Sequence, residues 1–315
     1  MPEQIRVGVN GYGVIGKRVA AAVSQQQDMS LAGVSDVVTD WRARMVVRNG
    51  FRLFGATGEN KNAMRAAGLD PAGTLEDLLW QVDVVVDCTP KRIAAKNVGA
   101  YRSGRIKFIL QGGEKHEATG HSFVAEANYA SAIGRDATRV VSCNTTSVVR
   151  TLTALKRAGL LRRARGTLLR RATDPWESHE SGIMNTLVPE SEIPSHQGPD
   201  AQTVDPELDV VTMAVKVPET LAHLHYWSVQ MTRRASKDEV LDALRTSSRI
   251  ALIRVSDGLV ALNTVKELMA DRARPHDIVI PETIDAIRAL TGTVTDANES
   301  IAATNAALGI EAALV

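Results

Sequence analysis

The 315-residue sequence has few aromatic residues, two cysteines, almost no net charge and no long apolar run. Because Cys88 and Cys143 are its only cysteines and fall in separate stretches, a disulfide framework cannot underlie the fold. A formal net charge of +1 gives no electrostatic footprint for a nucleic acid. No apolar run approaches the roughly 18 residues that a membrane-spanning helix needs. We therefore expect neither a nucleic-acid partner nor a membrane partner.

The composition is that of an ordinary soluble globular protein, with 44% hydrophobic and 23% charged residues. The length fits two domains or one large domain with ample core. The chain enters an apolar strand directly after residues 1–4, which leaves no room for a signal peptide. We therefore expect a cytoplasmic location.

Cys143 stands in the stretch VVSCNTT (140–146), where an apolar run gives way to small polar residues. A helical pattern follows from about Ser147, so the stretch predicts a strand, a tight turn and a helix with the cysteine near its N-terminus. Backbone N–H groups and the positive end of the helix dipole favour a thiolate over a thiol there. A free cysteine is more often a small packing residue, and this is what we expect of Cys88. The polar neighbours of Cys143 favour a nucleophile instead.

A glycine motif opens the chain. The strand at 5–9 runs into Asn-Gly-Tyr-Gly-Val-Ile-Gly, with glycines at Gly11, Gly13 and Gly16, and a helix and a second strand at 31–35 follow. Between a strand and a helix, this spacing is typical of a dinucleotide-binding turn. The first glycine permits the turn, the second admits the pyrophosphate, and the third lets the helix pack on the strand. We expect the phosphates at the helix N-terminus; a tight turn without a ligand is the alternative.

Asp36 closes the second strand, 20 residues beyond Gly16. A carboxylate at this place hydrogen-bonds the adenosine ribose hydroxyls and repels a 2′-phosphate. The sequence therefore predicts NAD as the cofactor in preference to NADP. A solvated aspartate in a turn is the alternative.

Strands and helices continue to alternate, which predicts an α/β domain with a parallel sheet. The strand at 82–87 is almost continuously apolar, as buried parallel strands are, and leads into Thr89 and Pro90. The next strand, at 106–110, leads into a loop that contains Gly113. Such sheets bind ligands at loops that follow the carboxyl ends of their strands. Thr89, Pro90 and Gly113 therefore belong to the predicted cofactor site.

The C-terminal half begins with basic and polar segments. The basic residues between 156 and 165 are expected at a solvated helix end. Arg171 is a better candidate for binding an anion, because it lies late in an apolar strand predicted over 166–173 and arginine binds phosphate through two hydrogen bonds. Residues 174–199 have few periodic apolar positions and predict a long functional loop.

Two antiparallel strands are predicted at 208–217 and 221–231, and the second carries His223 and His225. Their spacing places both imidazoles on one face of the strand. The favoured interpretation is a general base that serves Cys143. The alternative is a pair of metal ligands, but no further cluster of Cys or His accompanies them, so we expect no metal. Helices are predicted at about 237–246, 261–271, 281–290 and 296–308.

Taken together, these residues resemble the archaeal-type (type II) glyceraldehyde-3-phosphate dehydrogenases over the whole chain. The matching stretches are VGVNGYGVIGKRVA (7–20), VVVDCTP (84–90), QGGEK (111–115), VVSCNTT (140–146), LLRRATD (168–174), NTLVPE and IPSH (within 185–196), TMAV (212–215), ETLAHLHYW (219–227) and VIPETIDAIRAL (279–290). The set is specific, because a bare dinucleotide-binding domain would share only the first of them.

The resemblance implies an α/β fold with two domains. A Rossmann-type parallel-sheet dinucleotide domain spans 1–142 and is completed by a C-terminal helix at about 281–315. An α+β catalytic domain with a mainly antiparallel sheet spans 143–280. The resemblance also implies a homotetramer, with a dimer as the alternative, and it implies Cys143 as nucleophile and His223 as base. The other matched positions are Val14, Ile15, Gly113 and Arg171 for the cofactor or active site, and Ser142, Cys143 and Asn144 for the substrate. We further expect the substrate or phosphate to contact Thr145, Arg171, His196, Gln197 and Gly198.

Four positions depart from the family pattern. Asp36 replaces a common lysine, which reverses an expected tolerance of NADP. Gln197 stands where a second histidine is frequent. The segment 272–278 is shorter than in the family, so a pair of strands is expected to be missing, and a cofactor-contacting glutamine is replaced by Pro275 or lost. These departures leave the mechanism in place and put the substrate in question.

We therefore predict an NAD-dependent phosphorylating aldehyde dehydrogenase that resembles glyceraldehyde-3-phosphate dehydrogenase. Cys143 would form a thiohemiacetal and then a thioester with a small phosphorylated aldehyde, and inorganic phosphate would attack the thioester. One alternative is a dehydrogenase of another small phosphorylated or phosphonylated aldehyde that hydrolyses the thioester. Another is a nucleotide-binding redox sensor, against which the presence of both Cys143 and His223 argues, because a sensor does not need the base.

Overall fold

The computed structural model describes residues 4–111, 113–172, 185, 187–272 and 278–311. The chain divides into two compact units. The first unit comprises Met1–Ser142 and His276–Leu308, and the second comprises Cys143–Pro275 and Gly309–Val315. Among the described residues, no helix combines the length and the apolar character needed to cross a membrane.

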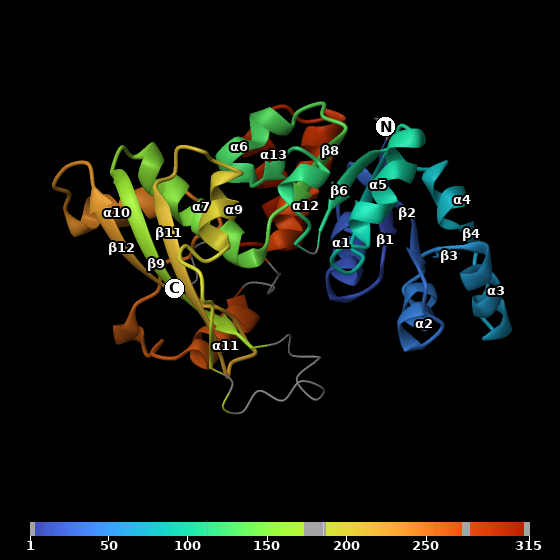
Figure 1. The fold of residues 1–315 in the computed structure, drawn as a ribbon, viewed down its shortest axis with the longest axis horizontal. Coiled ribbons are helices and arrows are strands. Elements are labelled where there is room, and N and C mark those ends of the chain that lie inside the picture. The colour runs from blue at the N-terminus through green and yellow to red at the C-terminus, as the bar shows by residue number, and fades with distance from the viewer. Residues whose placement is uncertain (1–3, 112, 173–184, 186, 273–277, 312–315) are drawn as a thin grey trace. The chain divides into compact units, whose positions relative to one another are not determined.

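Strands and helices alternate along most of the first unit (Figure 1). Its elements are β1 (Ile5–Asn10), α1 (Val14–Ser24), β2 (Met29–Asp36), α2 (Trp41–Arg48), β3 (Leu53–Gly55), α3 (Gly58–Ala66), β4 (Gly73–Thr74), α4 (Leu75–Leu79), β5 (Val84–Asp87), α5 (Ala94–Ser103), β6 (Lys107–Leu110), η1 (His116–Ala118), β7 (Ser122–Phe123), α6 (Ala125–Ala132), β8 (Ala137–Val140), α12 (Val279–Thr291) and α13 (Ala297–Leu308).

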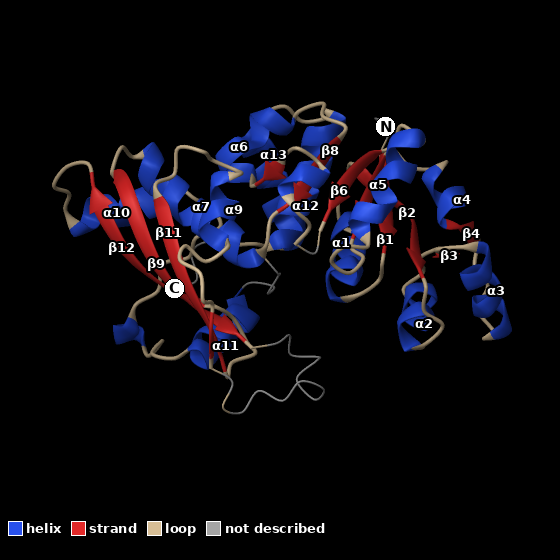
Figure 2. Ribbon diagram, in the orientation of Figure 1, coloured by secondary structure: helices blue, strands red, loops and turns tan. Residues whose placement is uncertain are grey.

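One eight-stranded sheet organises the first unit, in the order β4-β3-β2-β1-β5-β6-β8-β7. All of its strand pairs are parallel, which confirms the predicted Rossmann-type sheet (Figure 2). The centre of the sheet is apolar, and Val7, Val9 and Val85 have no exposed surface. The chain order reverses between β1 and β5. The loops after these two strands therefore open at the switch point where such sheets bind their ligands.

The chain returns to the first unit with α12 and α13, which lie beside α6 (Figure 1). Every residue of α12 from Val279 to Leu290 is buried, and this helix packs against β6, β8 and α1. The C-terminal helix expected over 281–315 is therefore two helices, as the separate patterns at 281–290 and 296–308 indicated. They separate at Gly292, whose φ of 71° is the left-handed conformation that ends a helix.

The buried helix α12 carries a charged side chain, Arg288, whose charge is compensated by hydrogen bonds and an ion pair. Its guanidinium is bonded to the carboxylate of Asp28 at 2.7 and 2.8 Å, to Gln26 Oε1 at 2.8 Å and to Thr304 Oγ1 at 2.6 Å. A buried cation is tolerated only when it is paired and hydrogen-bonded in this way. The arginine thus ties the C-terminal helices to the loop before β2.

The second unit holds a helix, a four-stranded sheet and further helices around it (Figure 1). Its elements are α7 (Cys143–Arg157), β9 (Leu161–Arg171), β10 (Val188–Pro189), α9 (Gln197–Gln202), β11 (Val210–Val217), β12 (Leu224–Met231), α10 (Lys237–Arg245), η3 (Val255–Asp257) and α11 (Leu262–Arg272). The strand order is β10-β11-β9-β12. Two of its three pairings are antiparallel, in agreement with the expected mainly antiparallel sheet.

Three local expectations for the second unit were wrong. β11 and β12 do not pair with each other, because β9 lies between them, parallel to β11 and antiparallel to β12. The basic residues Arg162, Arg163 and Arg165 lie on β9 rather than at a helix end. The region 174–199 is not all loop, since β10 and the first residues of α9 fall inside it. Residues 173–184 and the shortened part at 273–277, with Pro275, lie outside the described residues.

Candidate active site

Cys143 is the first residue of α7. The helix begins four residues before the predicted start at Ser147, so Asn144 and Thr145 belong to its first turn and are almost fully buried. No acidic residue occupies this turn. The backbone N–H groups and the positive end of the helix dipole therefore act on the sulfur without a competing carboxylate in the turn. Thr145 Oγ1 donates to Asp200 Oδ2 at 2.8 Å, which fixes the first turn of α7 to α9.

His223 stands next to this sulfur, with Nε2 3.4 Å from Cys143 Sγ. The residue directly precedes β12, and the pairing of Leu224 with Leu169 on β9 brings it opposite the end of that strand. The backbone N–H of Arg171, the last residue of β9, donates to His223 Nδ1 at 3.1 Å. The imidazole is thus held from both of its nitrogens.

The surroundings of His223 determine its charge and the position of its proton. Burial, together with the nearby charges of Arg171, His225 and Arg170, lowers its pKa to about 3, so the ring is neutral at pH 7. Nδ1 accepts the N–H of Arg171 and therefore carries a lone pair. The single proton of the neutral ring is then assigned to Nε2, the nitrogen that faces Sγ. A neutral N–H donor, rather than an imidazolium, faces the sulfur in this state.

His225, two residues further, contacts Asn144 instead of the sulfur. Its Nε2 lies 2.9 Å from Asn144 Oδ1, and the amide Nδ2 of Asn144 lies 4.0 Å from Cys143 Sγ. Burial lowers the pKa of His225 to about 4, so the ring is neutral, and because a carbonyl oxygen only accepts, Nε2 must carry the proton. This contact turns the amide N–H₂ of Asn144 toward the sulfur. Sequence reasoning missed this link, because the spacing of the two histidines predicts only that both lie on one face of their strand.

The predicted phosphate residues His196, Gln197 and Gly198 lie at the start of α9. Gln197 is fully buried, and its Nε2 lies 3.1 Å from His196 Nε2. The backbone N–H of Gly198 donates to Thr212 Oγ1 at 2.9 Å. Of the three, His196 alone presents its side chain to solvent, with 59% of it exposed.

Glu190 follows β10 and adds a carboxylate to this group, which the sequence did not predict. It is paired with Arg170, and its Oε2 lies 3.0 Å from His196 Nδ1. Burial opposes ionisation of Glu190, but the hydrogen bond from His196 and the charges of His196 and Arg170 outweigh it and lower the pKa of the carboxyl. An anion that approached His196 would therefore compete with an ionised carboxylate for the same donors.

The glycine turn of the first unit has the shape that a dinucleotide requires. Gly11 has a φ of +93°, and a Cβ there would lie 3.0 Å from backbone atoms of Cys88 and Thr89. A Cβ at Gly16 would collide with the carbonyl oxygen of Gly11 at 1.8 Å, whereas a Cβ at Gly13 would meet nothing within 4 Å. The turn therefore packs tightly against the protein at Gly11 and Gly16 and leaves free space beside Gly13. Val14 and Ile15 begin the eleven-residue helix α1, whose N-terminal N–H groups fit a pyrophosphate.

The carboxylate of Asp36 lies against this turn at the end of β2. Its Oδ2 accepts the backbone N–H of Tyr12 at 2.6 Å, and its Oδ1 accepts that of Val37 at 2.6 Å. Asp36 thus holds the glycine turn as well as being the predicted partner of the ribose. It is not a solvated residue of an isolated turn.

A buried carboxylate, Asp87, supports the loop that contains Thr89 and Pro90. Asp87 has no exposed surface and accepts hydrogen bonds from Thr89 N at 2.9 Å, Tyr101 Oη at 2.6 Å and Asn97 Nδ2 at 2.8 Å. Burial and the carboxylate raise the pKa of Tyr101 well above its usual value. Burial likewise raises the pKa of the neighbouring Cys88 thiol, as expected of a packing cysteine.

The remaining predicted positions fall in both units. Gly113 has a φ of +77° in the loop after β6, and Ser142 is the last residue of the N-terminal segment of the first unit. Arg171, predicted for both cofactor and phosphate, lies in the second unit and contacts His223 through its backbone. Within the described ranges, no three His, Cys, Asp or Glu residues are grouped so that they could hold a metal ion.

Comparison with known proteins shows which family the sequence matches. The family described as "Glyceraldehyde 3-phosphate dehydrogenase, C-terminal domain" matches residues 142–301. The glyceraldehyde-3-phosphate dehydrogenase of Methanobrevibacter smithii is 40% identical over 335 residues, which cover 96% of this chain and 99% of the relative. That of Archaeoglobus fulgidus is 40% identical over 337 residues, covering 98% of each chain. That of Methanococcoides burtonii is 38% identical over 337 residues, covering 98% of this chain and 99% of the relative. These alignments are longer than the 315 residues of this chain, so it lacks residues that the relatives have.

Proposed function

This chain belongs to the glyceraldehyde-3-phosphate dehydrogenase family of archaeal type, and on that premise we propose that it oxidises glyceraldehyde 3-phosphate with NAD and inorganic phosphate. Family membership makes it an oxidoreductase that acts on an aldehyde and uses a nicotinamide dinucleotide. The observation that carries the proposal is Cys143 at the first position of α7 with His223 Nε2 3.4 Å from its sulfur.

The first step is attack of the Cys143 thiolate on the aldehyde carbon. A C–S bond forms, the carbonyl π bond breaks, and the oxygen becomes an oxyanion. We assign the N–H groups at the start of α7 and the amide of Asn144, turned toward the sulfur by His225, as the donors to this charge. Donors held in place before the reaction stabilise an oxyanion without reorganisation. A proton from water then converts the oxyanion into the hydroxyl group of a thiohemiacetal.

His223 then takes the hydroxyl proton while the carbon releases its hydride. A bound NAD supplies the hydride acceptor. The contact with Arg171 sets a condition on this role: when Nε2 accepts a proton, the first ring proton must stand on Nδ1, opposite the Arg171 N–H. The contact at Nδ1 must therefore open in the base-competent form of the ring. The product of the step is a thioester on Cys143.

Inorganic phosphate completes the reaction by attacking the thioester carbon. The C–S bond breaks, the thiolate returns to Cys143, and an acyl phosphate leaves. We propose that the phosphates are held by Arg171 and by residues of the two helix starts. These residues are Ser142, Asn144 and Thr145 at α7, and His196, Gln197 and Gly198 at α9.

Glu190 favours a second candidate function. Its carboxylate is paired with Arg170 and His196, so an incoming phosphate must displace it. If phosphate fails to do so, water attacks the thioester, and the enzyme is a non-phosphorylating dehydrogenase of this or another small phosphorylated or phosphonylated aldehyde. Absorbance of NADH during turnover of glyceraldehyde 3-phosphate, with and without inorganic phosphate, separates the two. Phosphate-dependent turnover supports the first function, and turnover indifferent to phosphate supports the second.

We assign the dinucleotide to the first unit and the catalytic residues to the second. The open face at Gly13 and the start of α1 support a pyrophosphate there, with Thr89, Pro90 and Gly113 on neighbouring loops. The position of Asp36 beside the glycine turn supports NAD over NADP, because its carboxylate would repel a 2′-phosphate. A catalytic thiol also works best where cysteines stay reduced, which is why we propose the cytoplasm as its location.

A homotetramer is the proposed assembly, with a dimer as the alternative. One face of the second unit's sheet carries Tyr226, Thr167 and Met213 in a row across β12, β9 and β11. Tyr226 is 61% exposed and Met213 is 40% exposed, and Leu224 on the same face is 48% exposed. Large apolar side chains gathered on one sheet face are typical of a surface that a second subunit covers. Light scattering of the wild type and of Tyr226→Asp tests this, since the variant should shift toward smaller species.

A further inference from the structure

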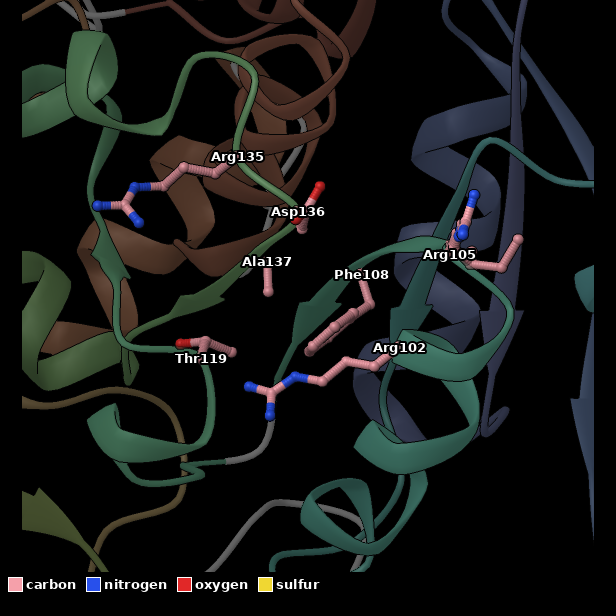
Figure 3. A pocket seen from close by; sticks show the side chains of 8 residues that line it. Arg102, Arg105, Phe108, Thr119, Arg135, Asp136 and Ala137 are labelled. Carbon is pink, nitrogen blue, oxygen red and sulfur yellow. The ribbon is translucent and has the colours of Figure 1, made fainter.

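A cavity of about 530 Å³ lies at the amino-terminal ends of two parallel strands of the first unit, β6 and β8, and the proposed function does not use it (Figure 3). Phe108 and Ala137 stand at the amino-terminal ends of β6 and β8, whereas the glycine turn follows the carboxyl end of β1. The lining residues are Arg102, Arg105, Ile106, Phe108, Thr119, Arg135, Asp136 and Ala137. The volume lies within the range of about 300–1,000 Å³ that is usual for small-molecule sites.

The walls of this cavity are fixed by hydrogen bonds from side chains and backbone. Lys107 Nζ donates to the carbonyl oxygens of Gly134 and Arg135 at 3.0 and 2.8 Å. The backbone N–H of Phe108 donates to Asp136 O at 3.0 Å. On the other side, Arg102 Nη2 donates to Ala118 O at 3.3 Å. The loop before β8 and the end of η1 are therefore held against β6 and α5, so the walls of the cavity are fixed by the protein itself.

The charge of the lining is strongly positive. Arg102, Arg105 and Arg135 form no ion pair with any carboxylate in the described part of the chain. Asp136 is the one acidic residue of the lining, and its side chain is 98% exposed and 3.9 Å from Lys107 Nζ. Figure 3 shows Arg102 extended across the cavity toward Thr119, whereas the guanidinium groups of Arg135 and Arg105 lie farther out, on opposite sides of the cavity. The floor, formed by Phe108, Ile106 and Ala137, is apolar.

Arg105 also adopts an unusual backbone conformation. Its φ is +55°, in the left-handed region, although the glycine of this turn, Gly104, stands one residue earlier with a φ of −75°. A left-handed conformation costs a residue with a side chain about 1 kcal/mol or more. Such outliers gather at ligand sites more often than elsewhere. The turn thus keeps an arginine at the rim in a conformation that glycine would adopt at lower cost.

We propose that this cavity binds a phosphate monoester with a small uncharged organic body. Three guanidinium groups against one carboxylate leave a net charge of +2, and a phosphate monoester carries nearly two negative charges at pH 7. Arginine binds phosphate oxygens through paired N–H donors, and the apolar floor fits the organic part. The site lies within the first unit and is separate from the glycine turn.

Phenyl phosphate is a suitable probe, because it joins a dianionic phosphate to an apolar ring. Hydrogen exchange of the full chain should slow in peptides that contain residues 102–108, 116–120 and 134–137 when the probe is added. Calorimetry should show a Kd at least about ten-fold weaker for the double variant Arg102→Gln/Arg135→Gln, since two charge-assisted contacts are lost. The matched control is Arg48→Gln/Arg65→Gln, which removes two exposed arginines of α2 and α3 in the same unit and should bind as the wild type does.

Two results would overturn the proposal. One is equal affinity of the wild type and the Arg102/Arg135 variant for phenyl phosphate. The other is protection confined to residues 143–145 and 196–198, which would place the probe at the proposed substrate site. The exchange experiment on the wild type gives its answer even if the double variant fails to fold. If the wild type shows no dehydrogenase activity, the proposed function is contradicted, and the outcome of the phenyl phosphate binding test does not change.

Discussion

Replacing His223 by glutamine or by alanine separates two functions of its imidazole, that of a general base and that of a hydrogen-bond donor to Cys143. Nδ1 accepts the Arg171 N–H at 3.1 Å, and Nε2 faces Sγ at 3.4 Å. A glutamine amide has the same pair of functions, an oxygen that accepts and an N–H₂ that donates. Unlike imidazole, it cannot take up a proton at neutral pH. Alanine provides neither function.

The two substitutions should therefore differ in one assay and agree in another. Loss of a general base typically costs about 10²–10⁴ in rate, so both His223→Gln and His223→Ala should lower kcat by this range. Alkylation of Cys143 by iodoacetamide depends on thiolate stabilisation instead. A hydrogen bond to a charged group contributes about 1.5–3 kcal/mol, so alanine should slow alkylation at pH 7 by about ten-fold or more. Glutamine should leave the alkylation rate close to that of the wild type.

Stopped-flow NADH formation and alkylation followed by mass spectrometry measure the two effects on the same preparations. If His223→Gln forms NADH within about ten-fold of the wild-type rate, which lies below the usual cost of losing a base, the base assignment is refuted. The imidazole would then act only as a hydrogen-bond donor, as its resting tautomer allows. Equal slowing of alkylation in both variants would instead refute the assigned tautomer.

Three further outcomes follow from the contacts described. Asp36→Asn keeps an acceptor for the Tyr12 N–H but removes the charge, so the kinetic preference for NAD over NADP should narrow by about ten-fold, or 1.4 kcal/mol; a wild type that uses both cofactors equally would contradict this. His225→Phe frees the Asn144 amide and should lower kcat by about ten-fold, the value of one hydrogen bond, with NAD affinity unchanged in a fluorescence titration. Because burial lowers the pKa of His225 to about 4, the unfolded chain binds the extra proton between about pH 6.5 and 4, and stability is lost as pH falls through this window. Between pH 7 and pH 4 in urea unfolding, the free energy of unfolding should fall by roughly 3 kcal/mol less in His225→Phe than in the wild type.

Features that depend on local sequence were predictable. The glycine turn is one, because each glycine has a steric role that the neighbouring strand and helix specify. The collision that a side chain at Gly16 would cause, and the open space at Gly13, match the roles that the motif assigns to them. The placement of Cys143 at a helix start is another, although the polar residues after it were taken for a turn. Serine, threonine and asparagine favour helix starts and turns alike.

Features that depend on distant residues were not predictable. β9 lies between β11 and β12. The alternation of apolar and polar residues along a strand does not indicate which strand lies next to it. Glu190 and Asp87 acquire their roles from partners on other elements, as do the contacts of His225 with Asn144. The residue pattern of a single sequence predicts the face of the helix or strand on which such a side chain lies. It does not predict which distant side chain contacts it.

The proposed reaction passes through a covalent thioester at Cys143 that phosphate releases. Electrospray mass spectrometry of the intact protein, mixed with glyceraldehyde 3-phosphate and NAD without phosphate and quenched in acid, measures this species directly. We predict the mass increase of a phosphoglyceroyl group, located on the peptide that contains Cys143, absent from Cys143→Ser and removed by inorganic phosphate before the quench. An unmodified Cys143 in an enzyme that forms NADH under these conditions, or acyl enzyme that phosphate does not discharge, would contradict the account.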